Sequence, residues 1–279
     1  MMEISIKKVF RAVGFSLLIL WAITSLLPLC WLFISAFTPS DFMLKMPPEF
    51  NPLNFRLDNF TRLFEETDLI WPWTINTFLI AASITVFNIF FCTLAGYVFA
   101  KMEFWGRDVL FAAFLSTMMI PAQVTLIPMF LLMKKIGLYN NHAAIILPQL
   151  AGVFGVFLLR QYIKTFPGDL LDAARIDGAT ELQIFFKLIV PMAKPAMAVL
   201  GIFVFMGQWK SLLWPLIILQ DQVKFTLEVG LATLQQQFAT NYGILMAGAG
   251  FSAVPMILIF FAFQQYLTEG LTVGGSLKG

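Results

Sequence analysis

Long apolar stretches dominate the pattern of hydrophobic and polar positions along this chain. A membrane-spanning helix needs about 20 mostly apolar residues, because its backbone polar groups find no water in the hydrocarbon and must bond to one another. The pattern therefore predicts an all-α membrane protein with six transmembrane helices and both chain ends on one side. The six runs lie near 13–37, 77–100, 109–133, 143–159, 195–219 and 243–267.

Basic residues indicate which side is cytoplasmic. With the N-terminus inside, eleven Lys and Arg residues lie on the inner side and six on the outer side, while Lys210 falls within the fifth run. Cytoplasmic loops usually carry the excess, so both termini are predicted to be cytoplasmic, although Lys134 and Lys135 oppose this trend. The first run follows basic residues like a signal peptide, but it is longer and has no clear cleavage site, so we expect a retained helix.

The spans define the domain organisation. The outer segment 38–76 contains several prolines around one possible short helix at 58–66, and it is either a contact for an external partner or a tether between two spans. The inner segment 163–194 is the other long connection. Three regions follow: a cytoplasmic N-terminus at 1–12, the six-helix domain at 13–267, and a cytoplasmic C-terminal tail at 268–279.

Composition narrows the class of protein. Hydrophobic residues make up 59% of the chain and charged residues 12%, against about 25% charged residues in soluble domains. The net charge of +2 and the lack of an arginine-rich segment argue against nucleic-acid binding. A single histidine and two separated cysteines offer no metal site or catalytic constellation, so neither a metal nor an enzyme is expected.

Acidic residues argue against one class of transporter. All sixteen lie outside the cores of the six runs. Proton- and sodium-coupled secondary transporters normally need such groups near the middle of the bilayer. Composition alone leaves a passive channel open.

The inner connection carries the most informative pattern. Residues 166–195 predict two short helices. Pro167 can open the first, and Gly178 suits the left-handed conformation that ends a helix. Thr180 with Gln183 has the spacing of a capping box for the second helix, which Pro191 must end or kink.

The first of these helices offers small and apolar side chains. Ala173 and Ala174 permit close approach of another protein. By composition alone, a structural elbow lying in the membrane interface and a docking element remain equal alternatives. The predicted apolar surface comprises Leu170, Leu171, Ala174 and Ile176.

This connection resembles the loop shared by permeases of ABC importers, in which EAA is followed after three residues by Gly and after nine more by I-x-L-P. Asp172, Ala173 and Ala174 take the EAA places, Gly178 the glycine, and Pro191 the proline. Asp for Glu shortens one contact, and Leu188 and Val190 replace Ile and Leu conservatively. The resemblance implies these ATPase-coupling residues: Leu171, Asp172, Ala173, Ala174, Arg175, Asp177, Gly178, Ala179 and Pro191.

Further segments extend the resemblance over nearly the whole chain and make it most similar to carbohydrate-importing permeases of the maltose type. They are AGYVFAKMEFWGRDVLF at 95–111, MIPAQVTLIPMFLLMKKIGLYNN at 119–141, FLLRQYIKTFPGDLLDAARIDGAT at 157–180, and the C-terminal GLTVGGSLKG.

The resemblance implies a transport subunit of the cytoplasmic membrane that carries motion without hydrolysing ATP. No GxxxxGK[ST] phosphate loop occurs in the sequence. ATP and Mg would therefore bind to a separate ATPase, with no cofactor on this chain. The implied partners are a second, homologous permease, two ATPase subunits and an external solute-binding protein. The solute would be a sugar or oligosaccharide, with a glycerol phosphate as the alternative.

The C-terminal tail resembles the family's strand that reaches into the ATPase dimer. Gly274, Gly275 and Lys278 would make those contacts. A glycine-rich end without any role is the alternative.

Polar and aromatic residues in the runs are candidates for a translocation path. A charge in mid-bilayer costs roughly 3 kcal/mol, so Lys210 either meets a polar substrate group or extends to the interface. The remaining candidates could equally be interfacial anchors or interhelical hydrogen bonds, and in some relatives only the partner permease holds the sugar. The candidates are Asn76, Gln123, Gln208, Trp209, Lys210 and Trp214.

Overall fold

Helices form the architecture of the chain. The computed structural model describes residues 2–40, 55–237 and 241–273, and within these ranges it contains helices and no strands. The helical fold predicted from the sequence is confirmed. The chain divides into two compact units, one of residues 1–68 and 231–254, the other of residues 69–230 and 255–279.

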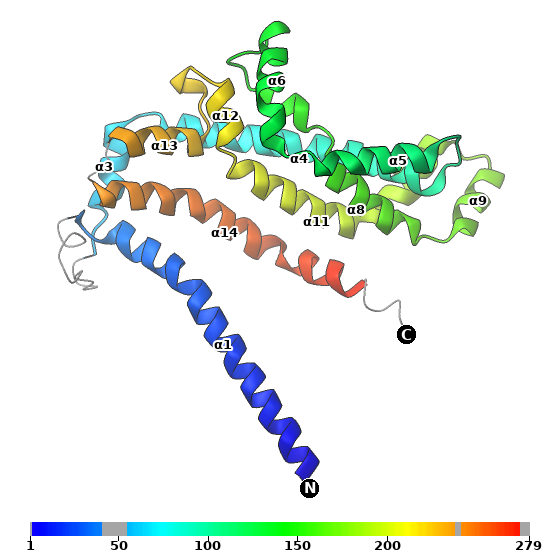
Figure 1. Cartoon of the computed structure of the whole chain (residues 1–279), viewed down its shortest axis with the longest axis horizontal. Helices are drawn as coiled ribbons and strands as arrows, with labels where there is room; N and C mark the ends of the chain where they lie inside the picture. The colour runs from blue at the N-terminus through cyan, green and yellow to red at the C-terminus, as the bar shows by residue number, and fades with distance from the viewer. Residues whose placement is uncertain (1, 41–54, 238–240, 274–279) are drawn as a thin grey trace. The chain divides into compact units, whose positions relative to one another are not determined.

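The larger unit holds most of the spanning helices. Figure 1 shows α9 and α12 at opposite ends of the long helices α4 and α11. In chain order the elements are α4 Ile70–Lys101, α5 Arg107–Ser116, α6 Ala122–Lys135, α7 Ala143–Ile146, α8 Val153–Lys164, α9 Gly168–Ile176, α10 Glu181–Ile184, a π-helical turn Phe185–Ile189, α11 Val190–Trp209 and α12 Leu213–Ile218. Short 3₁₀ turns lie at Thr117–Met119, Leu147–Gln149 and Gln222–Lys224, and α13 Leu227–Gln237 and α14 Tyr242–Val273 follow.

Small residues let α4, α8 and α11 pack closely. A Cβ atom on Gly96 would lie 3.0 Å from Leu159, and one on Gly155 would lie 2.7 Å from the Cys92 sulfur. Helix contacts in membranes depend on such small side chains, because lipid supplies no hydrophobic drive to bring helices together. The buried cluster runs from Cys92 and Tyr97 on α4 to Leu200 on α11.

Among the residues that the structure describes, five helices are long and apolar enough to span a membrane, and a bent pair makes a possible sixth. The pair is Arg107–Met119 with Ala122–Lys135, bent by 99°. The run predicted near 109–133 therefore corresponds to this bent pair and not to one continuous helix. Pro121 has no N–H to continue a helix, and the preceding Ile120 is extended with ψ 116°, as residues before proline prefer.

The fifth span also differs from its predicted limits. It runs without interruption from Glu181 to Trp209, so Pro191 does not end the helix. A π turn lies immediately before Pro191 and is closed by a hydrogen bond from Val190 N to Phe185 O. This wider turn accommodates the proline ring without ending the helix. Pro215 lies in the first turn of α12, where its missing N–H costs little, and this favours a new helix after Trp209.

The smaller unit contains α1 Met2–Phe37, α3 Asp58–Glu66, and parts of α13 and α14. The short helix predicted at 58–66 is confirmed by α3. Asn59 on α3 donates hydrogen bonds to the carbonyl oxygens of Ala36 and Thr38 at 3.0 and 2.9 Å. These bonds tie α3 to the end of α1.

Candidate coupling site

The helix α9 ends at Ile176, and Gly178 follows in the left-handed conformation that the sequence predicts. Gly178 has φ +81°, its N–H bonds to Arg175 O, and Ala179 N bonds to Ala174 O, both at 3.0 Å. This pair of bonds is the Schellman arrangement, in which glycine takes the left-handed position without a steric penalty. The turn fixes the direction in which the chain leaves α9.

The capping box that opens α10 is also confirmed. The Thr180 hydroxyl accepts a bond from Gln183 N at 3.3 Å, and the Gln183 side chain accepts one from Thr180 N at 2.9 Å. Pro167 precedes the first residue of α9, as expected. The two helices are therefore defined at their boundaries by local hydrogen bonds.

The outer face of α9 differs partly from the predicted surface. Ile176 is 86% exposed, and Asp172, Ala173 and Asp177 are also exposed, whereas Ala174 is half-buried. Leu171 is only 2% exposed and packs into the core. The Leu171 side chain therefore holds α9 against the buried cluster. The prediction that Leu171 belongs to an exposed contact surface is wrong.

A charged network surrounds the last turn of α9. Arg175 donates from Nε to Glu181 Oε1 and from an η nitrogen to Asp172 Oδ1, each at 2.9 Å. The hydrogen bond to Glu181, followed by that to Asp172, raises the pKa of Arg175. Tyr97 on α4 donates its hydroxyl proton to the other oxygen of Glu181. Arg175 was predicted from the sequence, but Tyr97 and Glu181 were not. The one available signal for Glu181 was its position in the first turn of a capped helix, where acidic residues are favoured.

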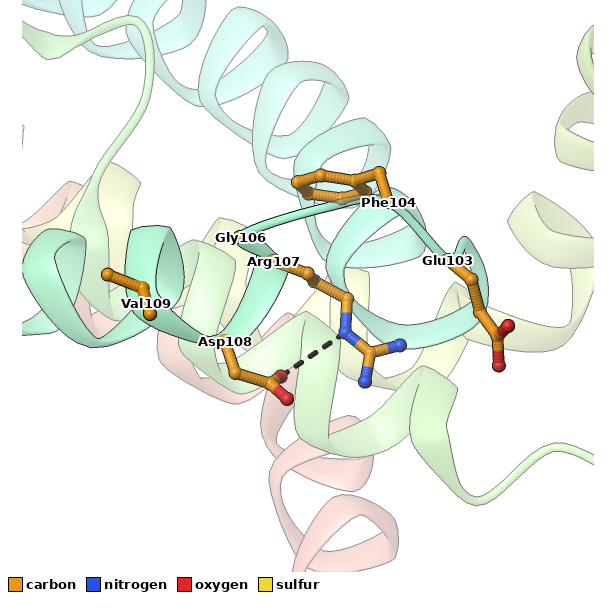
Figure 2. A pocket seen from close by; sticks show the side chains of 6 residues that line it. All are labelled: Glu103, Phe104, Gly106, Arg107, Asp108 and Val109. Carbon is orange, nitrogen blue, oxygen red and sulfur yellow. Dashed lines mark hydrogen bonds and ion pairs between the residues drawn. The ribbon is translucent and has the colours of Figure 1, made fainter.

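Two open hollows lie beside this network. The larger, of about 610 Å³, is lined by the end of α4, by α9 and by Glu181. The smaller, of about 350 Å³, follows the connection from Glu103 to Val109 (Figure 2). There Arg107 Nε lies 3.2 Å from Asp108 Oδ1, so the two side chains form an ion pair.

Two of the translocation-path candidates hold the opposite end of the unit together. Asn76 donates to the carbonyl oxygens of Val223 and Phe225 at 2.8 and 3.0 Å. Trp214 donates from its indole nitrogen to Ala144 O at 3.0 Å. Both residues match the alternative of interhelical hydrogen bonds.

The other path candidates do not line the two hollows described above. Trp209 is 3% exposed and stacks on Phe205. Lys210 is exposed and follows the last residue of α11, so it lies at a helix end rather than inside a span. Gln208 is half-buried and Gln123 is exposed near the start of α6. The tail residues Gly274, Gly275 and Lys278 lie outside the described residues.

The single histidine has a structural contact. His142 Nε2 lies 2.8 Å from Lys224 O, next to the loop that Asn76 holds. Among the described residues, no three His, Cys, Asp or Glu side chains come together as metal ligands would.

Several helices able to span a membrane, with a two-helix element at one end, are the architecture of a multi-pass membrane protein. Residues 92–273 match the family described as the binding-protein-dependent transport system inner membrane component. The chain belongs to this family, and its predicted resemblance to ABC permeases is confirmed. It is a transport subunit of the inner membrane and not an enzyme.

Similar proteins support the same family over the full length. The chain is 39% identical over 269 residues to the arabinooligosaccharides transport system permease protein AraQ of Halalkalibacterium halodurans, covering 96% of this chain and 95% of that protein. It is 34% identical to the lactose transport system permease protein LacG of Rhizobium radiobacter, covering 95% and 96%. A crystal structure of a bacterial ABC transporter that imports alginate matches with TM-score 0.81 and 25% identity, covering 93% and 96%.

Proposed function

We propose that this chain is the permease subunit of an ATP-driven importer for an oligosaccharide, with arabino-oligosaccharides as the first candidates. The 39% identity to AraQ across nearly both full lengths carries this proposal. Its similarity to the lactose permease protein LacG supports the wider sugar class. Both termini are proposed to be cytoplasmic, in agreement with the distribution of Lys and Arg.

The element of α9 and α10 is proposed to dock on a separate ATPase subunit. Its exposed face combines Ala173 with Ile176, which suits close apolar contact, and Asp172 and Asp177 supply charge at the rim. Two such ATPases would bind ATP and Mg and would rock this chain against a second, homologous permease by alternating access. The solute would arrive from an external binding protein, and Gly274, Gly275 and Lys278 would reach the ATPases.

Uptake measurements test the solute class. Cells that express the transporter with its partner permease, ATPase and binding protein should accumulate radiolabelled arabinotriose in an ATP-dependent manner. Glycerol phosphates, the alternative solutes, belong in the same panel. Osmoprotectants belong there too, because the chain is also 35% identical to an osmoprotective compounds uptake permease protein, GgtD of Synechocystis. Uptake of those solutes with no sugar uptake would overturn the sugar assignment.

A pair of substitutions tests the docking face. Ala173 is exposed, so Ala173→Trp should leave the protein in the membrane while its bulk prevents close approach of the ATPase. Ala173→Ser keeps the residue small and is the matched control. The Trp variant should lose both uptake and co-purification of the ATPase, whereas the Ser variant should retain both. Normal ATPase binding by the Trp variant would refute docking at this face.

A further inference from the structure

The last turns of α4 contact the docking element at two places. Tyr97 and Lys101 are four residues apart and so lie on one face of the helix. Tyr97 is 1% exposed, and its hydroxyl donates to Glu181 just after α9. The Lys101 ammonium donates to the carbonyl oxygens of Phe166 and Lys164 just before α9, at 2.5 and 3.3 Å. We call these hydrogen bonds, which reach residues on either side of α9 and not α9 itself, the α4–α9 contacts.

The Glu181 carboxylate connects three elements. One oxygen accepts from Tyr97 on α4, and the other accepts from Arg175 in the last turn of α9 at 2.9 Å. Glu181 is itself the first residue of the helix that continues to Trp209 as the fifth span. A displacement of α9 is thereby shared between two spans through one side chain.

Packing alone gives α9 little rigidity. It has nine residues, and only Leu171 among them is buried. A helix of this length is marginal in water without tertiary contacts. Its orientation therefore depends on bonds at its two ends, and the α4–α9 contacts supply one at each end.

We propose that Tyr97 and Lys101 are positioning residues that make α4 move together with α9 when the ATPase moves α9. The inference rests on the proposed docking role of α9. Loss of the contacts would let α9 turn without moving α4. ATP would then be hydrolysed with less solute carried.

The Tyr97 hydroxyl can be removed without disturbing its packing. The ring lies tilted against that of Phe185 with 6.1 Å between the centroids, and Tyr97→Phe keeps that ring. The complete transporter in proteoliposomes should hydrolyse ATP at nearly the wild-type rate, while arabinotriose transported per ATP should fall about fivefold or more. Tyr139→Phe is the matched control, because it loses a hydroxyl bond of 2.9 Å to Gln220 at the other end of the unit.

Combining Tyr97→Phe with Glu181→Gln tests whether the residues act as one unit. Substitutions within one network lower activity by less than the sum of their separate effects. The solute transported per ATP should therefore fall no further in the double variant than in Glu181→Gln alone. Additive losses would overturn the proposal. An unchanged ratio of solute transported to ATP hydrolysed in Tyr97→Phe would also overturn it. Equal losses of ATP hydrolysis, transport and thermal stability would do the same, because that pattern indicates a structural role only.

Hydrogen exchange provides a readout that needs no solute. In the purified complex, amides of residues 168–176 should exchange faster in Tyr97→Phe than in the wild type or Tyr139→Phe. Unchanged exchange would refute the positioning role. Absence of any ATP-dependent uptake by the wild type would instead refute the proposed function, so the two failures are distinguishable.

Discussion

Substitutions of Gly178 can separate two effects at the proposed docking element, backbone strain and added side-chain bulk. The residue has φ +81°, and a Cβ atom there would meet no atom within 4 Å. Any penalty for substitution therefore comes from the backbone and not from a clash within the chain. Alanine in the left-handed region costs roughly 1–2 kcal/mol. Valine is β-branched, so its cost should lie near the upper end of the range of about 1–3 kcal/mol for such backbone strain.

These penalties convert into equilibrium constants. Since about 1.4 kcal/mol is a factor of ten, alanine should lower the equilibrium constant for the capped turn about tenfold and valine about a hundredfold. Asparagine tolerates positive φ best among the residues with side chains, so it should cost least despite its size. The expected order of ATP-dependent uptake is Gly178, then Asn, Ala and Val, with Val close to zero.

The assay compares uptake of arabinotriose with the amount of each variant in the membrane and with the ATPase that co-purifies. Membrane levels should stay similar, because Gly178 lies outside the buried cluster. If Asn transported less than Ala, side-chain bulk against the partner would be the cause and the strain argument would be refuted. Normal uptake by the Val variant would refute the docking role as well.

Two further predictions concern packing and the translocation path. Asn76→Ala removes two hydrogen bonds worth about 1 kcal/mol each. The purified transporter should therefore lose thermal stability with no change in KM for arabinotriose. A KM increase of about tenfold at unchanged stability would instead place Asn76 on the substrate path. Gly155→Ala places a methyl group 2.7 Å from the Cys92 sulfur, so overpacking should destabilise the protein by about 1–3 kcal/mol. Cys92→Ala in the same chain should recover most of that loss in thermal denaturation, and no recovery would contradict the packing.

Local chemistry explains which elements could be predicted from the sequence. Gly178, the Thr180–Gln183 pair and the helix at 58–66 depend on residues within one or two turns, and the structure has all three. Apolar runs located the spans for the same reason. The bend at Pro121 was not predicted, because hydropathy records how apolar a segment is and not its direction.

The site was predictable only where it is continuous in the chain. Tyr97 and Glu181 are 84 residues apart, and neither lies in an unusual local pattern. Asn76 looked available for a sugar because its partner carbonyl oxygens lie 147 and 149 residues further on. Pairing over such separations depends on the tertiary fold, which residue spacing alone does not encode.

The uninterrupted helix from Glu181 to Trp209 has a mechanical consequence. Its 29 residues at 1.5 Å rise each give a rod about 43 Å long, which exceeds the hydrocarbon thickness of about 30 Å. The helix is therefore longer than the hydrocarbon is thick, and tilting it as one body by about 5° would shift its far end by roughly 4 Å. A small rotation of this helix at one membrane surface would thereby move residues at the opposite surface, because its backbone is helical throughout.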